Sequence, residues 1–412
     1  MSLGVLGIYI CLFLGLYFEV FLLITFFEKR PAKKTSKLPK HYPSIAVLVP
    51  SYNEERTIEG TVRSLLTLKY PKSKLSVVIV DDGSTDNTRE IGERLARESK
   101  QVQYFYKENG GKYTALNFGI NHVKTDLIGC LDADSFVEPD ALLEVVKQFE
   151  ADPATMAITP VMKVFRPRNL LELMQSVEYT FGIFFKKMFD NMAALNVLPG
   201  PFSVYRKEVF EKIGLFKHAH NTEDMEIAFR MHANGLKIVN AHNALVFTTV
   251  PNTLHSLLKQ RTRWSQGFLQ NSRDYAFMYF NPRFGHFGFL VLPFGLMAFF
   301  AGIYTASFVL FSMTTKLFER AYSFWMSGIP FQFKMPLIQF EWFYLNTSMM
   351  TFLILVVLGL TVTAILLGRS IGKSDITLKS VVAYFALFGF IAPIWLVRAT
   401  WGALRAHESS WR

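Results

Sequence analysis

The chain has 412 residues, half of them apolar, with 40 Phe and a formal net charge of +11. Its mean hydropathy is positive, which indicates segments that lie in a bilayer. The two cysteines, Cys11 and Cys130, both lie in apolar segments. The composition therefore excludes a disulfide framework and a cysteine-based metal site.

The positive net charge does not by itself indicate a nucleic-acid-binding protein. Much of the excess of Lys and Arg lies beside the apolar segments, where basic side chains meet anionic lipid headgroups and determine topology. We therefore expect a lipid bilayer as a partner and no nucleic acid.

The first predicted element is a membrane anchor. Residues 3–27 form an apolar run interrupted only by Glu19, and this run is long enough to span a hydrocarbon core. An acid at this depth either faces a path through the membrane or pairs with a basic residue near the interface. We assign residues 1–28 to an N-terminal transmembrane anchor, since a cleaved signal peptide needs a basic start and a shorter apolar core.

A basic juxtamembrane linker, residues 29–43, follows the anchor. By the positive-inside rule, its charge predicts that the next domain is cytoplasmic, in a multi-pass protein of the plasma membrane. The basic residues concerned are Lys29, Arg30, Lys33, Lys34, Lys37 and Lys40.

Residues 44–252 have the alternating pattern of an α/β domain. The predicted strands are residues 44–49, 75–80, 102–106 and 127–131. The predicted helices between them are residues 54–68, 86–99 and 112–123. This alternation implies a mostly parallel sheet, in which ligands gather at the carboxyl ends of the strands.

Polar side chains follow three of these strands at their carboxyl ends. They are Tyr52 and Glu54 after the first strand, Asp81 and Asp82 after the second, and Asp132 and Asp134 after the fourth. An Asp-x-Asp pair can hold a divalent metal against a diphosphate. Lys112 begins a helix behind two glycines, where a cation and free backbone N–H groups can meet phosphate. The spacing of the glycines is not that of an ATP-binding loop.

Residues 253–282 predict an amphipathic helix at the membrane interface, because apolar residues recur at helical spacing before the next apolar segment. Gln260, Arg263 and Trp264 fall at positions i, i+3 and i+4 and share one face. Arg263 can grip a diphosphate, with Arg261 as a second candidate, and Trp264 can stack on a sugar ring. Alternatively, Trp264 belongs to the belt of aromatic residues at a membrane surface.

Residues 283–412 form a C-terminal transmembrane region with about three spans, predicted at 286–312, 347–368 and 380–398. Counting spans from the anchor places the C-terminal tail outside the cell. The tail nevertheless carries Arg398, Arg405 and Arg412, which leaves open whether one span is re-entrant or miscounted.

Several of these motifs together carry a family resemblance. They are Pro50–Glu55, Val80–Thr88, Gly111–Asn117, the Asp-x-Asp, Thr222-Glu223-Asp224 and Gln-x-x-Arg-Trp at 260–264. Over about residues 45–270 the chain resembles the family 2 glycosyltransferases with a GT-A fold. Within that family it looks most like the processive membrane synthases of poly-N-acetylglucosamine, chitin, cellulose and hyaluronan. The resemblance implies an α/β GT-A domain, a Rossmann-like mixed sheet, that is cytoplasmic and embedded between transmembrane α-helices.

The resemblance implies a UDP-sugar donor. Tyr52 and Glu54 are then expected at the nucleotide, and Asp82, with Asp81 beside it, can accept a hydrogen bond from the uracil N3–H. The alternative is that Asp81 and Asp82 only start a turn or cap the helix after Thr85.

The diphosphate is expected beside Lys112 and Arg263. Asp132 and Asp134 would share the work of holding the ribose and a Mg²⁺ or Mn²⁺ ion, with Asp134 as the main metal ligand. The ion would neutralise charge on the departing UDP.

Asp224 is the expected general base, because the acceptor hydroxyl must lose its proton as it attacks the anomeric carbon. A single displacement would invert an α-linked donor to a β-linked product. Glu223 and Glu226 are alternatives by residue type. These acids also suit the first turn of a helix, which is the structural alternative.

The acceptor is expected to contact a loop at 198–203 that includes Gly200 and Phe202, together with Glu223, Gln260 and Trp264. Glycine permits close backbone approach. Pro201 departs mildly from the small residue that many relatives carry.

Three functions remain open. The first is inverting, metal-dependent transfer of a sugar, with N-acetylglucosamine as the best guess, to a growing β-linked polysaccharide, coupled to its export. The second is a non-processive transferase acting on a lipid-linked acceptor. The third, a transporter or receptor with a degenerate nucleotide-binding domain, conflicts with the complete set of acids. The sequence leaves accessory subunits and oligomeric state open.

Overall fold

The computed structural model describes residues 3–28, 38–328 and 348–405. Most of the basic linker lies outside the described residues, including Lys29, Arg30, Lys33, Lys34 and Lys37, as does Arg412 in the tail.

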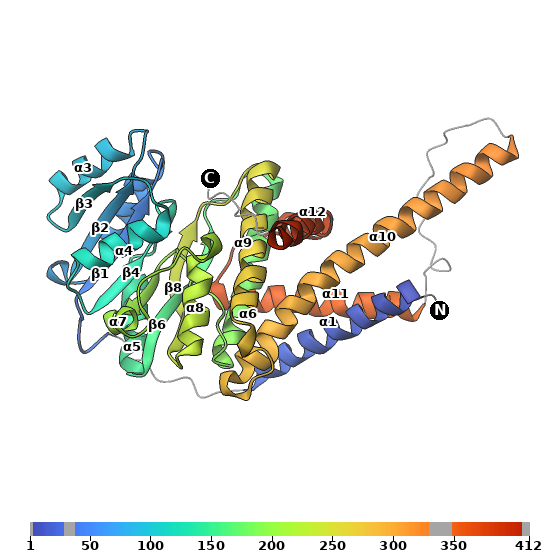
Figure 1. Cartoon of the computed structure of the whole chain (residues 1–412), viewed down its shortest axis with the longest axis horizontal. Coiled ribbons are helices and arrows are strands. Elements are labelled where there is room, and N and C mark those ends of the chain that lie inside the picture. Colours follow the sequence, from blue (N-terminus) through green and yellow to red (C-terminus); the bar gives the residue numbers. More distant parts are fainter. Residues whose placement is uncertain (1–2, 29–37, 329–347, 406–412) are drawn as a thin grey trace.

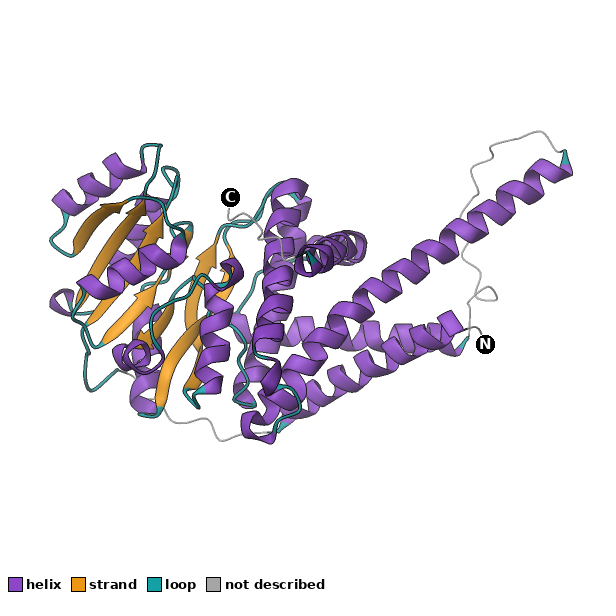
Figure 2. Ribbon diagram, viewed as in Figure 1, coloured by secondary structure: helices purple, strands orange, loops and turns teal. Residues whose placement is uncertain are grey.

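The α/β domain is built on one eight-stranded mixed sheet (Figures 1 and 2). The strand order is β3-β2-β1-β4-β7-β6-β8-β5. The strands are β1 (Ile45–Ser51), β2 (Leu75–Asp82), β3 (Val102–Lys107), β4 (Leu127–Cys130), β5 (Ser135–Val137), β6 (Thr155–Val164), β7 (Ser203–Arg206) and β8 (Lys237–Thr248). The four strands expected from the sequence are β1 to β4, and they pair in parallel. β7 pairs antiparallel to both β4 and β6, so the predicted mixed sheet is confirmed.

Alternation of side chains along the strands creates two cores, one on each face of the sheet. Val47 and Val49 of β1 point into a core with helices α2 (Ile58–Leu66), α3 (Thr88–Glu98) and α5 (Ala141–Ala151). Ala46 and Leu48 of the same strand point to the other face. The helices on that face are α4 (Lys112–His122), α7 (Lys207–Ile213) and α8 (Glu223–Ala233).

Two long helices stand between the sheet and the membrane helices: α6 (Leu170–Asn191) and α9 (Leu254–Asp274). The Asn169 side chain accepts from the backbone N–H of Glu172, and the Glu172 carboxylate accepts from that of Asn169, so a capping box starts α6. Thr253 caps α9 through the N–H of Ser256. α9 lies within residues 253–282, the range in which the sequence predicted an amphipathic helix.

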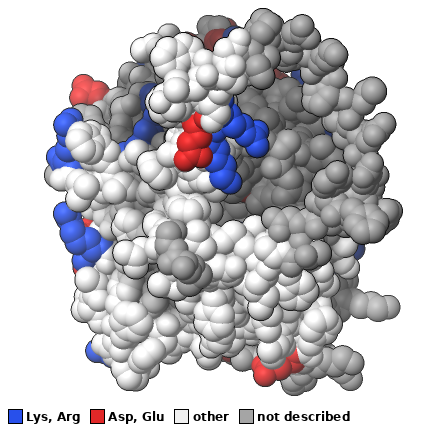
Figure 3. Space-filling view, turned by 90° about the vertical axis from the view of Figure 1, so that its right-hand side faces the viewer, with Lys and Arg blue, Asp and Glu red and all other residues white. Residues whose placement is uncertain are grey.

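Within the described residues, four helices are long and apolar enough to cross a membrane. They are α1 (Leu3–Phe27), α10 (Leu292–Ser327, continuous with a π-helical turn at Phe287–Val291), α11 (Met349–Gly372) and α12 (Leu378–Leu404). The predicted spans fall on these helices. Figure 3 views the end of the molecule toward which α1, α10 and α11 extend, and Lys, Arg, Asp and Glu are sparse on its described surface.

α12 runs in a different direction from the other three apolar helices. α1, α10 and α11 extend away from the sheet, whereas α12 is seen nearly end-on beside α9 (Figure 1). Its Tyr384 packs with Leu257 of α9 and Met174 of α6, and its Trp395 packs with Leu258. α12 therefore braces the two helices that stand against the sheet.

Glu19 faces α11 within the membrane region. Its Oε1 accepts a hydrogen bond of 2.6 Å from the Thr361 hydroxyl. The partner of this acid is thus a neutral hydroxyl on a neighbouring helix rather than the basic residue that the sequence offered as one alternative.

Candidate active site

A cavity of about 960 Å³ opens at the carboxyl ends of β1, β2 and β4 and extends to α6 and α9. Edges of this kind collect ligands in α/β sheets. Among the residues singled out in the sequence, those that line the cavity are Tyr52, Glu54, Asp82, Lys112, Asp132, Asp134, Gly200, Pro201, Glu223, Asp224, Gln260, Arg261, Arg263 and Trp264. Asp81 and Phe202 do not line it.

Asp81 is fully buried and serves the turn after β2. Its Oδ1 accepts from the backbone N–H of Ser84 at 2.8 Å, and its Oδ2 accepts from the Tyr104 hydroxyl at 2.8 Å. The structure therefore agrees with the turn alternative for Asp81 and does not bring this residue to the cavity.

Asp82 lines the cavity and also fixes the loop that precedes α4. Its oxygens accept from the backbone N–H groups of Gly110 (3.1 Å) and Gly111 (2.8 Å) and from the Lys107 ammonium. Because a carboxylate offers about four acceptor positions, about one remains for a ligand. Gly111 has φ +90°, a conformation that glycine adopts without strain.

Glu54 and Tyr52 lie on the loop after β1. The Glu54 carboxylate accepts from the Thr57 hydroxyl at 2.8 Å, and the Glu54 backbone N–H donates to the Thr88 hydroxyl at 2.7 Å. The bond to Thr57 links the loop to the start of α2, and the bond to Thr88 attaches it to α3. They hold Tyr52 and Glu54 in the wall of the cavity.

Lys112, the first residue of α4, connects the two acidic motifs. Its Nζ lies 2.6 Å from Asp132 Oδ1 and 3.2 Å from Glu223 Oε1. Burial favours the neutral amine, but the charges of Asp132, Glu223 and Asp224 outweigh burial and raise the pKa of Lys112 above its ordinary value. Lys112 is therefore a fixed positive charge at a helix N-terminus, where a diphosphate would be stabilised.

Asp134 is the more isolated acid of the Asp-x-Asp pair. Its Oδ1 accepts from the Ser135 hydroxyl at 3.1 Å. Burial, together with the charge of Asp132, raises the pKa of Asp134 to about 6. Burial and the neighbouring charge disfavour the ionised form of Asp134, and a cation bound beside it would stabilise that form.

The Asp-x-Asp pair fits a hard divalent cation. Across the part of the chain that the structure describes, no cluster of three or more His, Cys, Asp or Glu could form a full protein cage. Asp132 and Asp134 supply two carboxylates on the cavity wall, and Mg²⁺ ordinarily takes its other ligands from substrate phosphates and water. The donor set therefore suits a metal that arrives with a nucleotide.

Gly200 brings the acceptor-side loop against the Asp-x-Asp motif. A β carbon at position 200 would overlap both carboxylate oxygens of Asp132. Phe202, two residues on, has φ +63° and is fully buried in the core that contains Val47. Phe202 therefore anchors this loop in the core, and only its glycine reaches the cavity.

Asp224 lies in the first turn of α8 and faces the cavity. Burial raises its pKa to about 6, with the Glu223 charge adding to the effect. The pKa of Glu223 is lowered because Lys112 outweighs burial. Of these two neighbouring acids, Asp224 is thus the one whose proton affinity suits a general base.

Glu226, the other alternative base, is occupied elsewhere. It bonds Arg230 Nη2 at 2.9 Å and the Tyr275 hydroxyl at 2.6 Å, and it does not line the cavity. The structure therefore leaves Asp224 and Glu223 as the acids of this motif that reach the cavity.

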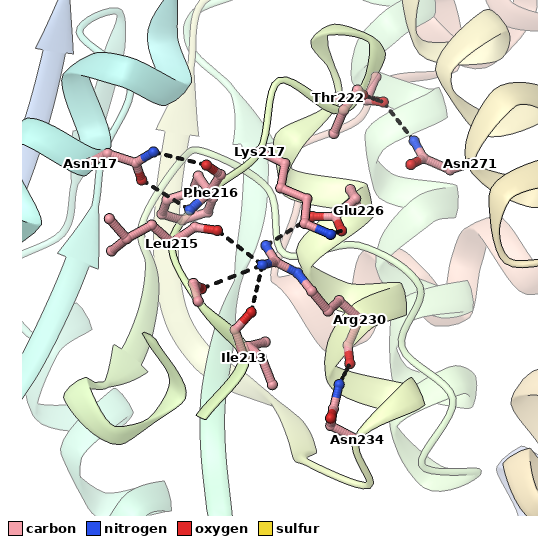
Figure 4. A network of polar contacts seen from close by, with 12 residues as sticks. Asn117, Ile213, Leu215, Phe216, Lys217, Thr222, Glu226, Arg230, Asn234 and Asn271 are labelled. Atoms are coloured by element: carbon pink, nitrogen blue, oxygen red, sulfur yellow. Dashed lines mark hydrogen bonds and ion pairs between the residues drawn. The ribbon is translucent and has the colours of Figure 1, made fainter. Parts of the chain in front are cut away.

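A polar network holds the segment that leads into these acids (Figure 4). The Asn117 side chain of α4 bonds both the N–H and the carbonyl of Phe216, at 2.9 and 2.8 Å. Arg230 donates to the carbonyls of Ile213 and Leu215, and Asn271 of α9 donates to the Thr222 hydroxyl at 2.9 Å. These partners come from distant segments, and the sequence did not indicate them.

α9 presents Gln260, Arg263 and Trp264 to the cavity as its spacing predicted. Arg263 Nη1 donates to the carbonyl of Asn221 at 3.0 Å, which ties α9 to the loop before Asp224. The Arg261 guanidinium lies over the Trp264 ring, with its carbon 4.3 Å from the ring centroid. Trp264 is therefore held on the cavity wall rather than free at the membrane surface.

α6 supplies a wall that the sequence reasoning missed. Glu178 bonds Arg261 Nη2 at 2.9 Å, and Tyr179 and Lys186 also line the cavity. Burial raises the pKa of Glu178 despite the nearby Arg261, and burial lowers the pKa of Lys186 to about 7 despite the charge of Asp224. The only sequence signal was charged residues at helical spacing within an otherwise apolar helix.

The chain is similar to known glycosyltransferases. Residues 46–214 match the family described as Glycosyl transferase family 2. The chain is 32% identical over 260 residues to a poly-beta-1,6-N-acetyl-D-glucosamine synthase of Staphylococcus aureus, covering 62% of this chain and 63% of the relative. It is 31% identical over 261 residues to the synthase of the same name from Staphylococcus epidermidis, again covering 62% and 63%. The chain thus spans less than two thirds of the length of these curated relatives.

Among solved structures, the chain is similar to a mannosyltransferase from Pyrobaculum calidifontis in complex with GDP-Man and Mn²⁺. The TM-score is 0.68 at 18% identity, and the match covers 98% of this chain and 99% of the other. At this identity the likeness establishes the fold alone. Residues 46–214 therefore match a glycosyl transferase family 2 domain, and the fold is of the GT-A type.

Proposed function

We propose that the chain is an inverting hexosyltransferase that transfers a sugar from a UDP-sugar to the end of a growing β-linked polysaccharide. N-acetylglucosamine is the sugar we favour, because the similar staphylococcal synthases carry that sugar in their names. The observation that carries the proposal is a single cavity lined by Lys112, the Asp-x-Asp pair, Asp224 and Trp264. A donor site, a base and a ring-stacking surface thus share one volume.

The donor half of the cavity supports binding of a nucleoside diphosphate. Tyr52 offers an aromatic face, Asp82 retains an acceptor position for a base N–H, and Lys112 and Arg263 bring positive charge to the phosphates. Asp132 and Asp134 would hold Mg²⁺ or Mn²⁺, which when bound supplies Lewis-acid stabilisation of the leaving UDP.

The acceptor half supports removal of a proton from a sugar hydroxyl. Asp224 accepts the proton as the acceptor oxygen forms its bond to the anomeric carbon and the bond to UDP breaks. Trp264, fixed by Arg261, would stack on the ring of the terminal acceptor sugar. One displacement on the face opposite the UDP converts an α-linked donor into a β-linked product.

The site favours a transferase that works at the membrane. α6 and α9 line the cavity, and their other neighbours include the apolar helices α11 and α12. We propose that the catalytic domain faces the cytoplasm of a multi-pass plasma-membrane protein and that synthesis is coupled to export.

The orientation is tested by cysteine labelling. Cysteines placed at residues 98 and 404, in a chain lacking Cys11 and Cys130, would be labelled with an impermeant maleimide in oriented vesicles. Residue 98 must label from the cytoplasmic side, and residue 404 reports whether α12 crosses.

The function is tested with purified protein in detergent, supplied with a panel of UDP-sugars and either Mg²⁺ or Mn²⁺. UDP release and product size are measured. A ladder or polymer from one donor is the expected result. A single sugar on an extracted lipid would instead establish the lipid-linked acceptor, and no transfer from any donor would overturn the proposal.

A further inference from the structure

One stripe of α6 forms a wall of the cavity beyond the residues assigned above. Glu178, Gly182 and Lys186 follow one another at positions i, i+4 and i+8, and all three line the cavity. Positions at this spacing lie on one face, and the stripe extends about 12 Å along the helix axis. An acid, an open position and an amine therefore stand in a row.

The stripe lies on the side of the cavity away from the nucleotide-binding elements. α6 packs on β6 and β8 and, on its other side, against α11 and α12. The donor-side residues come from β1, β2, α4 and β4, farther along the sheet (Figure 1). A molecule resting on α6 would therefore be on the acceptor side of the reacting bond.

Gly182 has no packing reason to be glycine. A β carbon at this position would meet no atom within 4 Å among the described residues, whereas one at Gly368 of α11 would strike the carbonyl of Thr180. Glycine is among the poorest helix formers, so its place in the middle of a long helix requires another explanation. Glycine keeps this part of the cavity open, because any side chain at position 182 would project into it.

Lys186 retains one donor for a ligand. Its Nζ donates to the Thr159 hydroxyl at 3.0 Å and to the carbonyl of Pro160 at 3.3 Å, both on β6. In its protonated form the amine has three N–H donors, and the third has no partner within the described residues. The side chain is fixed by two bonds and presents the remaining N–H at the cavity wall.

Glu178 joins the other end of the stripe to the stacking residue. Its bond to Arg261, at 2.9 Å, orients the guanidinium that covers the Trp264 ring. Gln260 also lines the cavity, and its Oε1 atom is buried and has no hydrogen-bond partner among the described residues. Arg261 thus links α6 to Trp264, and α9 adds one acceptor without an internal partner to the same cavity.

We propose that Glu178, Gly182 and Lys186 form a subsite for one neutral, hydroxylated sugar unit of the acceptor chain. The carboxylate accepts from a sugar hydroxyl, the ammonium donates to another sugar oxygen, and the glycine lets the ring approach the helix backbone. This inference rests on the proposed transferase function and adds the residues that read the acceptor.

A size series at position 182 tests the subsite. Gly182→Ala, Gly182→Leu and Gly182→Phe are compared for transfer to a β-1,6-linked N-acetylglucosamine trisaccharide and for UDP release without acceptor. The expected result is a progressive loss of acceptor kcat/KM, about tenfold or more for Leu, with donor KM unchanged. Gly359→Leu is the matched control, since position 359 also lies in a helix with open space around it but does not line the cavity.

The amine is tested separately. Lys186→Met should raise the acceptor KM about tenfold with little change in donor KM, and Lys186→Arg should recover part of the loss. Transfer that is insensitive to the size of residue 182, or to the loss of the Lys186 charge, would overturn the subsite. Failure of the proposed function would look different, because the wild-type chain itself would then transfer no sugar to the trisaccharide.

Discussion

The α carbon of Gly200 rests directly against the carboxylate of Asp132, so closely that a β carbon at position 200 would overlap both oxygens. The loop expected to hold the acceptor is therefore in contact with the motif expected to hold the donor and its metal. The same Asp132 pairs with Lys112 at 2.6 Å. Asp132 therefore contacts both the loop expected to hold the acceptor and the lysine expected to hold the phosphates.

Gly200→Ala should weaken donor binding. The new methyl group would displace the Asp132 carboxylate and disturb its pair with Lys112, at a cost of about 1–3 kcal/mol by overpacking. Titration calorimetry with UDP and Mn²⁺ would measure the loss. Gly359→Ala, which has room for a methyl group, serves as the control. Unchanged affinity in Gly200→Ala would mean that the contact has no part in donor binding.

Asp224→Asn should lower turnover by about 10²–10⁴-fold while leaving UDP binding intact, because the amide cannot take the acceptor proton. The folded-state pKa of Asp224 is raised to about 6, so the ionised base accumulates only as pH rises through 6. Wild-type activity should therefore fall steeply below that pH at saturating metal.

The same pKa shift gives a control for folding. A carboxyl whose pKa is raised in the folded state stabilises the fold at low pH, and this contribution is lost as pH rises through 6. Asp224→Asn should therefore unfold at neutral pH no more readily than wild type, measured by thermal denaturation in detergent. Wild-type turnover in this variant would show that another group is the base.

Asp134 should make metal affinity depend on pH. Burial and the charge of Asp132 raise its pKa to about 6, so protons compete with the metal below that value. We expect Mn²⁺ affinity in the presence of UDP to fall about tenfold per pH unit below 6. Electron paramagnetic resonance of free Mn²⁺ measures this affinity. An affinity that does not depend on pH would argue against a metal site at Asp134.

Lys112→Met should be strongly destabilising, because it leaves Asp132 and Glu223 near each other without a cation. Removing one partner of a buried ion pair costs about 3–5 kcal/mol. Adding Glu223→Gln to this variant should recover part of the loss by removing the unpaired charge. Chemical denaturation of the single and double variants checks this, and equal stability of Lys112→Met and wild type would contradict the arrangement.

The sequence predicted residues that line the cavity wherever they belong to a local motif. The acids that end β2 and β4 reach one edge because parallel strands deliver their carboxyl ends together. It could not separate Asp81 from Asp82, since neighbouring residues on a strand point to opposite faces and only the sheet shows which face meets the cavity. Phe202 likewise turns inward because its backbone has a positive φ that no sequence pattern indicated.

Contacts between distant segments were beyond the sequence. Glu178 and Arg261 are 83 positions apart, and Asn117 and Phe216 are 99 apart. No sequence motif includes both partners of either pair. α12 shows the same limit for the fold, because its apolar length predicted a span but not its direction across α6 and α9.

Glu178→Gln tests whether this unpredicted pair positions Trp264. The amide keeps the shape of the side chain but loses the charge that fixes Arg261, whose guanidinium would then cover the indole less often. We expect acceptor kcat/KM to fall about tenfold, corresponding to the loss of one charge-assisted hydrogen bond, with UDP affinity unchanged.

The matched control is Glu208→Gln, which breaks the exposed pair of Glu208 with Lys212 at 3.3 Å. Exposed pairs of this kind contribute little, so this variant should behave as wild type. The fluorescence of Trp264, isolated by replacing the other tryptophans with Phe, adds a readout that general destabilisation would not mimic. Adding the trisaccharide acceptor should change this fluorescence less in Glu178→Gln than in wild type. A wild-type response in both fluorescence and acceptor KM would show that Trp264 holds its place without Glu178.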